Sequence, residues 1–178
     1  MRITDDRYNR DLLRYELARR LIRHQARTQT IRLWTGLTHD RIRKLYRTYP
    51  PVERVRRRRG KSPRQVTFFL RSHRRKFETS VLASMFSIYD ALPARPDIHS
   101  AKGRSNVTRG ISLVDAFEAY SAVLVKPNIT FEHAELLLEE LESGNELQVS
   151  HCTDCTGVVV VDRLSLLPPS CTQCRGPA

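Results

Sequence analysis

The sequence predicts a mainly α-helical protein with a helix-turn-helix-like N-terminal part and a small cysteine-bearing module at its C-terminal end. Apolar residues recur with helical spacing, glycine and proline fall where helices would end, and all four cysteines lie within the last 27 residues. We therefore expect a helical domain over residues 1–145 and a separate module over residues 146–178.

Residues 7–28 are expected to form the first helix. Leu13, Leu17 and Leu21 recur at four-residue intervals on one side of it. Glu16 precedes Arg20 by four residues, a spacing that favours an ion pair along a helix. The wide apolar sector predicts packing against more than one neighbour.

Residues 27–49 are typical of two helices joined by a tight turn, as in a helix-turn-helix. Gly36 is a suitable C-cap for the first helix, and Thr38 is a natural N-cap for the second, with Asp40 in its first turn. Trp34 is expected in the core. The second helix has one apolar side and one strongly basic side. The residues expected to contact DNA from the basic side are Arg41, Arg43, Lys44 and Arg47.

The positive charge of the chain is concentrated in one block. The formal net charge is +12, yet residues 41–76 alone hold 15 Lys and Arg against the single acid Glu53. A solvated helix face would mix the two signs, so the block favours a nucleic-acid contact over a merely soluble basic surface or an anionic membrane patch. Residues 50–65 are expected to be an exposed basic loop. Its expected phosphate contacts are Arg56, Arg57, Arg58, Arg59, Lys61 and Arg64.

Residues 66–92 are expected to form a central helix. Phe77, Val81, Met85 and Ile88 form an apolar stripe, and the other side carries small residues, with Asp90 as the only charge between 79 and 91. A helix without a charged face is buried on most sides, within the domain or within an assembly. Further helices are expected over 112–124 and 130–142, followed by a strand at 146–150.

The cysteines stand as Cys152-x-x-Cys155 and, after fifteen residues, Cys171-x-x-Cys174. A two-residue gap lets one tight turn direct two sulfurs at one metal, and the glycine after each pair would supply a positive φ. This spacing is typical of a closed four-thiolate zinc site. Two disulfides would suit a secreted chain, and a redox Cys-x-x-Cys would not occur twice. We therefore expect one structural Zn²⁺ per chain.

The segment between the two cysteine pairs is expected to be a hairpin, which would make the module a zinc ribbon. Residues 158–161 and 164–167 are short apolar runs separated by Asp162-Arg163, and Pro168-Pro169 ends the second. The free energy with which four thiolates bind zinc is comparable to the folding free energy of a whole domain, so the ribbon should fold only with its metal. Its net charge with zinc is negative. We therefore expect a structural clamp, with DNA contacts left to the basic block.

Other functional classes find little support. There is no apolar run long enough to cross a membrane and no N-terminal signal segment, so we expect a cytoplasmic protein. The six histidines sit in no metal-ligand or nucleophile spacing, and no phosphate-binding glycine loop is present, so we expect no enzymatic activity. One acidic cluster is interpreted as an exposed helix face or partner surface. Its members are Glu135, Glu139, Glu140 and Glu142.

In their order and spacing, these motifs resemble the family of the bacterial flagellar transcriptional activator FlhC over most of the chain. The resemblance rests on Arg41-Ile-Arg-Lys-Leu-Tyr-Arg47 after the Thr-Gly-Leu-Thr38 turn, on Ala83-Ser-Met-Phe86, and on Val114-Asp-Ala116 with Ala119-Tyr120. Glu142-Ser-Gly144 then precedes Leu147-Gln148 and the two cysteine pairs.

The resemblance implies a DNA-binding subunit that works with FlhD, in an assembly of four FlhD and two FlhC chains. It implies zinc on Cys152, Cys155, Cys171 and Cys174. It further implies activation of flagellar operons, through binding to upstream promoter DNA and contact with RNA polymerase. The run Arg56-Arg57-Arg58-Arg59 is denser than the family pattern.

Two alternatives stay open. An RNA-binding zinc-ribbon protein would be equally basic, and competition of duplex DNA against structured RNA would distinguish it. A FlhC-like regulator of non-flagellar genes would share all of these motifs. A nuclease would require a carboxylate or histidine cluster beside the basic block, which Glu53 alone does not supply.

Overall fold

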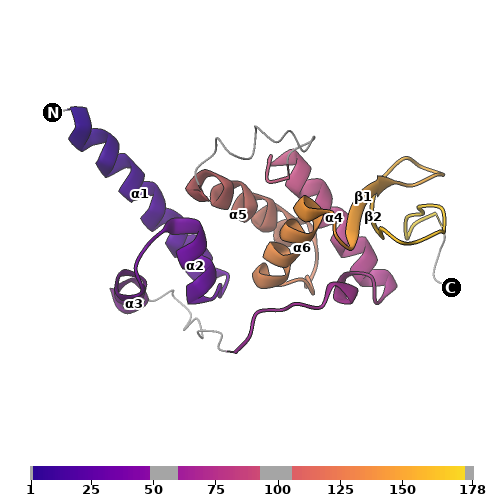
Figure 1. Cartoon of the computed structure of the whole chain (residues 1–178), viewed down its shortest axis with the longest axis horizontal. Helices are drawn as coiled ribbons and strands as arrows, with labels where there is room; N and C mark the ends of the chain where they lie inside the picture. The colour runs from indigo at the N-terminus through magenta and orange to yellow at the C-terminus, as the bar shows by residue number, and fades with distance from the viewer. Residues whose placement is uncertain (1, 49–59, 93–105, 175–178) are drawn as a thin grey trace.

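The computed structural model of the chain describes residues 2–48, 60–92 and 106–174, with side chains from Tyr8 onward. As predicted, the protein is mainly helical, with a small two-stranded sheet near its C-terminal end (Figure 1). No helix among the described residues is long and apolar enough to cross a membrane. The elements are α1 (Arg2–Arg23), α2 (Thr28–Thr35), α3 (His39–Thr48), the 3₁₀ helix η1 (Val66–Phe69), α4 (His73–Ile88), α5 (Asn106–Val123), α6 (Phe131–Ser143), β1 (Leu147–His151) and β2 (Val158–Asp162).

The first helix packs mainly through its C-terminal half. Leu17 and Leu21 are buried as predicted, together with Ile31 of α2 and Ile42 of α3, whereas Leu13 is exposed. Figure 1 shows the N-terminal end of α1 projecting away from the other helices. The apolar side of α1 is therefore buried against other helices in its C-terminal half and exposed to solvent in its N-terminal half.

Arg20 joins α1 to α5. The prediction of an ion pair between Arg20 and Glu16 is wrong. The guanidinium of Arg20 instead donates to Asp115 at 2.5 Å and to Glu118 at 2.8 Å. His24, in the turn directly after α1, lies 2.9 Å from the same Glu118 carboxylate. A bridge between two helices therefore replaces the expected local pair.

The fifth helix begins at Asn106, so the predicted start at Ser112 is wrong. Asn106 and Gly110 made this stretch resemble a loop. Gly110 instead allows close packing, because a Cβ there would lie 2.9 Å from Leu17 Cδ2 and 3.1 Å from Trp34 Cβ. Helix approach, and not chain flexibility, explains this glycine. Trp34 itself is buried, as predicted.

The predicted central helix over 66–92 is interrupted. It consists of η1 and then α4, which begins after Ser72. The Ser72 hydroxyl accepts a hydrogen bond from the backbone N–H of Arg75 at 3.3 Å, so Ser72 caps a new helix. At the other end, α4 stops at Ile88, and Asp90 has a left-handed backbone with φ 56°.

Only part of the apolar side predicted for α4 is buried, because Leu82 and Phe86, which broaden the apolar stripe in the sequence, are enclosed and the end of the stripe is not. Leu82, Ala83 and Phe86 have no exposed surface, whereas Ile88 of the predicted apolar stripe is 71 % exposed. Small side chains such as Ala83 let α5 and β2 approach the helix axis closely, which favours burial of that side. Part of the larger apolar stripe is left for solvent or for a partner.

Glu78 on α4 has no exposed surface. Its carboxylate accepts hydrogen bonds from Arg74 Nε at 2.7 Å, from Tyr120 OH at 2.9 Å, and from the backbone N–H and Nδ2 of Asn128 at 2.8 and 3.0 Å. Burial alone would raise the pKa of Glu78, but these donors outweigh it and leave the pKa below its ordinary value. An ionised carboxylate therefore joins α4, α5 and the turn before α6.

The two strands form an antiparallel hairpin around the first cysteine pair. Leu147 lies opposite Asp162, and His151 lies opposite Val158. The strand predicted at 146–150 is confirmed. The predicted hairpin between 158–161 and 164–167 is wrong, because Asp162 Oδ1 accepts from the N–H of Leu164 at 2.8 Å and ends β2. The leucines that follow are exposed, and Leu166 is fully so.

The hairpin shares one core with the helices. β2 packs against α4, and Leu147 and Val160 belong to the same cluster of buried side chains as Leu82 and Phe86. The strands are thus continuous with the helical body. The peripheral part of the C-terminal module is the pair of cysteine-bearing loops.

The substitution Glu78→Gln should destabilise the protein by about 3 kcal/mol, because it removes a buried charge that four donors surround. Urea unfolding measures this loss. Since the pKa of Glu78 is lowered in the folded state, its contribution is present above the ordinary value of about 4.5 and disappears as the pH falls below it. Wild type and variant should therefore converge in acid.

Glu16→Gln is the matched control, because Glu16 is exposed on α1 and the same change there should alter stability by less than about 0.5 kcal/mol. Equal stability of Glu78→Gln and wild type at neutral pH would contradict the role given to the buried carboxylate.

Candidate metal centre and basic surface

The four cysteines come together as predicted. The sulfurs of Cys152, Cys155, Cys171 and Cys174 all lie within 4.8 Å of one another, and those of Cys155 and Cys171 are 3.6 Å apart. A tetrahedral Zn²⁺ with bonds of about 2.3 Å requires sulfurs about 3.8 Å apart. The cluster therefore has the size needed to hold one metal ion such as zinc.

Backbone N–H groups point at the sulfurs. The N–H of Cys171 donates to Cys152 Sγ at 3.2 Å, and the N–H of Cys174 donates to Cys171 Sγ at 3.3 Å. Such donors favour the thiolate. The N–H groups of Cys155, Cys171 and Asp154 lower the pKa of Cys152 to about 6, and the N–H of Cys174 lowers that of Cys171. The donor set therefore suits a metal that binds thiolates.

The turn after the first cysteine pair is built differently from the prediction. Thr156, and not Gly157, has the positive φ, at 58°. Gly157 is required for another reason, because a Cβ there would lie 3.3 Å from Cys155 Sγ. The backbone closes around the turn through the N–H of Thr156, which donates to the Cys152 carbonyl at 2.9 Å. The glycine after Cys174 lies outside the described residues.

The two cysteine loops hold each other and the body. The N–H of Thr153 donates to the carbonyl of Pro169 at 3.0 Å, which joins the first loop to the second. His73 Nε2 lies 2.8 Å from the carbonyl oxygen of Thr172, to which it donates from the start of α4. Sequence patterns could not predict this link, because His73 and Thr172 are 99 positions apart in the chain.

Within residues 27–48, two helices, α2 and α3, are joined by a short turn, and Tyr49 lies outside the described residues. α2 ends at Gly36, which has φ 67°, and the N–H of Arg41 approaches Thr38 Oγ1 at 3.4 Å at the start of α3. Ile42 and Leu45 are buried, and the opposite side of α3 is exposed. The predicted DNA contacts on this exposed side are Arg41, Arg43, Lys44 and Arg47.

The other predicted phosphate contacts fall in the basic loop. Lys61 and Arg64 are described and exposed. Arg56, Arg57, Arg58 and Arg59 lie outside the described residues. Arg43 makes a loose pair with Asp40 at 3.6 Å, and both side chains are largely exposed, so this pair contributes little. The cations of α3 are therefore available to an anionic partner.

A half-buried acid, Glu135, joins α2 to α6. Glu135 accepts hydrogen bonds from Trp34 Nε1 at 2.8 Å and from Thr30 Oγ1 at 3.0 Å, so it does not belong to an exposed acidic face as expected. Burial raises the pKa of Glu135 to about 7 despite these donors, and the charges of Glu132 and Glu139 raise it further. The site also positions α3, because α2 leads directly into it.

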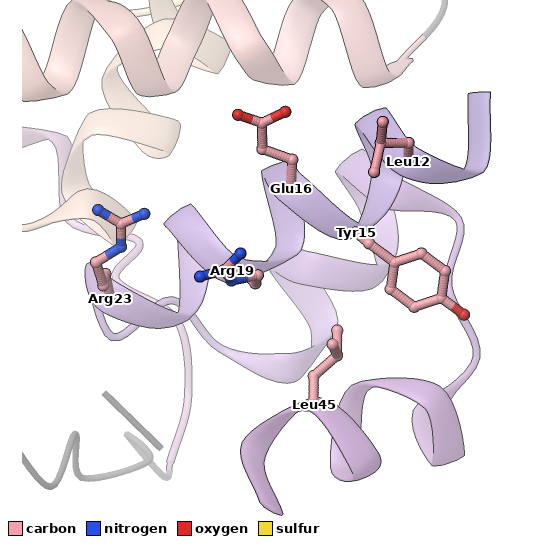
Figure 2. A pocket seen from close by; sticks show the side chains of 6 residues that line it. All are labelled: Leu12, Tyr15, Glu16, Arg19, Arg23 and Leu45. Carbon is pink, nitrogen blue, oxygen red and sulfur yellow. The ribbon is translucent and has the colours of Figure 1, made fainter. Parts of the chain in front are cut away.

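A hollow of about 490 Å³ lies between α1 and α3 (Figure 2). Leu12 and Tyr15 of α1 and Leu45 of α3 contribute its apolar lining, and Arg19 and Arg23 contribute positive charge. Leu12 is 53 % exposed. The hollow lies beside α3, the helix that carries the exposed cations, so a partner bound in the hollow would lie next to any anionic ligand bound by those cations.

Removing the metal should disorder the two cysteine loops and leave the helices folded, because Cys152 is the only buried cysteine and the helices pack through a cluster of other apolar side chains. Elemental analysis of the purified chain should give one metal ion per chain. Cys171→Ser should lose it, while Ser170→Ala beside it should not. A chain that binds no metal, or that loses its helical circular dichroism signal with the metal, would contradict this assignment.

Glu135→Gln should stabilise the protein at about pH 8 and have little effect at about pH 4.5. The folded state raises the pKa of this half-buried carboxyl to about 7, so the folded state holds its proton more tightly than the unfolded chain and loses stability as the pH rises from about 4.5 through 7. The gain should approach an upper limit on the order of 3 kcal/mol. Thermal unfolding across this range tests it, with Glu16→Gln as the exposed control, because Glu16 is not among the charges that raise the pKa of Glu135. A constant difference between wild type and variant would refute the burial argument.

Comparisons with known proteins do not identify the chain. No protein-family model matches it, and no curated protein matches it either. Its function must be argued from the residues themselves, from the cysteine cluster and the exposed basic side of α3.

Proposed function

We propose that this chain is the DNA-binding subunit of a cytoplasmic transcription activator of the FlhC type. In this proposal it acts with FlhD, binds promoter DNA upstream of flagellar operons and recruits RNA polymerase. The observation that carries the proposal is the exposed, four-cation side of α3, which follows a short helix and a glycine turn.

The charge on α3 fits a phosphate-rich partner. Ile42 and Leu45 are buried, whereas the four cations of α3 are exposed to solvent. A helix presented in this way has the dimensions to enter the major groove of duplex DNA. Phosphate contacts position a protein and base contacts specify its site, so the cations support DNA binding in general and not a particular promoter.

We assign the cysteine cluster to one structural zinc. Four thiolates fill a tetrahedral zinc site and leave no position for a water molecule. Within the described residues, the metal-ligand cluster contains only these four side chains. The loops that it would hold are linked to the start of α4 by His73, so the metal would secure the C-terminal end of the fold.

Exposed apolar side chains support a role within an assembly. Leu12 beside the α1–α3 hollow, Ile88 at the end of α4 and Leu166 in the loop after β2 are 53 %, 71 % and 100 % exposed. Scattered apolar residues are ordinary on a surface, but the Leu12 site is concave and lined by further apolar groups. FlhD is the partner that the family resemblance suggests.

The proposal predicts that the chain co-purifies with FlhD and that the complex binds duplex promoter DNA with a strong salt dependence. If about six phosphates are contacted, log K should fall against log salt with a slope near −5. Arg41→Gln/Lys44→Gln should reduce the slope by about 2 in magnitude, because two phosphate contacts are lost. Arg10→Gln/Arg14→Gln, on the projecting half of α1, removes the same charge as a control.

Different failures contradict different parts. No complex with FlhD would refute the FlhC-type assignment. A flat salt dependence would refute the electrostatic contact. Tighter binding to structured RNA than to duplex DNA of equal length would favour the RNA-binding alternative, and promoters recovered from genomic DNA would separate flagellar from other targets.

A further inference from the structure

The basic block of the sequence extends beyond the predicted DNA contacts. It continues through the start of α4, where Arg74, Arg75 and Lys76 follow one another. This turn lies against the second cysteine loop, because His73 donates to the Thr172 carbonyl at 2.8 Å. The last cations of the block are therefore placed beside the candidate metal centre.

The three cations have different surroundings. Arg74 is committed to the fold, because it donates to Glu78 and to the carbonyl oxygen of Val125 at 2.8 Å. Arg75 lies over the ring of Phe68, with its guanidinium carbon 4.1 Å from the ring centroid. Lys76 is exposed, and its carbonyl oxygen accepts a hydrogen bond from the Ser80 hydroxyl at 2.9 Å, whereas its ammonium group makes no ion pair or hydrogen bond with another described residue.

The position of the Arg75 guanidinium is restricted by its contact with the Phe68 ring. Phe68 stacks on His133, with ring centroids 4.0 Å apart, so the aromatic surface below the guanidinium is itself fixed. A guanidinium stacked on a ring keeps its N–H groups at the edge free to donate to phosphate. Because its position is already restricted, it loses less conformational entropy on binding.

These cations stand apart from α3. Figure 1 shows α3 toward one end of the longest axis and the start of α4 toward the other, with residues 60–65 running along the lower edge between them. Lys61 and Arg64 are exposed on that segment. Arg71 is a weaker candidate, because Glu146 and Asp162 line the same small hollow.

We propose that Arg75 and Lys76 form a second duplex-DNA contact, separate from α3 and positioned by the cysteine loop through His73. The inference rests on the proposed DNA binding and extends it: one chain would grip phosphates at two places along the same duplex. Two linked contacts strengthen binding only when the DNA is long enough to reach both.

The test compares Arg75→Gln/Lys76→Gln with wild type on duplexes of about one and about three helical turns. On the long duplex the variant should reduce the salt slope by about 2 in magnitude, since each phosphate contributes about 0.9. On the short duplex, which α3 can occupy alone, the two proteins should bind equally. Lys76→Gln should give half the effect and is the milder variant should the double one unfold.

Arg10→Gln/Arg14→Gln again controls for the loss of charge. A long-duplex slope equal to that of this control would overturn the second contact. If Arg41→Gln/Lys44→Gln still weakened binding in that case, the proposed function would stand without it. Absence of salt-dependent duplex binding by wild type would overturn both.

Discussion

The buried carboxylate of Glu78 is the interaction on which the arrangement of the molecule depends. It draws a donor from α4 itself, one from α5 and two from the turn before α6. An ion without exposed surface is costly unless its lone pairs are satisfied, and here all of the donors must be in place together. The carboxylate therefore selects one packing of these three segments among the many that apolar contacts alone would permit.

The consequences reach both functional regions. Arg74, which satisfies Glu78, lies between His73, which binds the cysteine loop, and Arg75, which stacks on Phe68. In the N-terminal part of the chain, Glu135 of α6 accepts hydrogen bonds from α2 and so positions α2 and the start of α3 that follows it. The pKa values of the two acids shift in opposite directions. Hydrogen-bond donors together lower the pKa of the buried Glu78, whereas loss of solvent contact raises the pKa of the half-buried Glu135. Only the first behaves as an ordinary paired carboxylate.

Local signals predicted much of the fold and of the metal cluster. Gly36 and Gly144 end α2 and α6 as expected, and the cysteine spacing brings four sulfurs together. The predictions of helix bounds and strand pairing were wrong where contacts between distant parts of the chain determine the local structure. Gly110 serves close helix packing, Ser72 divides the central helix, and the valines of β2 pair with β1 and not with the leucines that follow. No local pattern could assign Glu78, His73 or Glu135 to partners so distant in sequence.

The separation of those partners affects how the chain folds. Arg27 meets Glu132 across 105 positions, Trp34 meets Glu135 across 101, and His73 meets Thr172 across 99. Contacts between residues so far apart in sequence are expected to form late in folding. Closing the long loop between them costs chain entropy before the contact can stabilise the fold. During synthesis α2 and α3 emerge before α6, so the contacts that Trp34 and Thr30 of α2 make with Glu135 can form only after about a hundred further residues have been added.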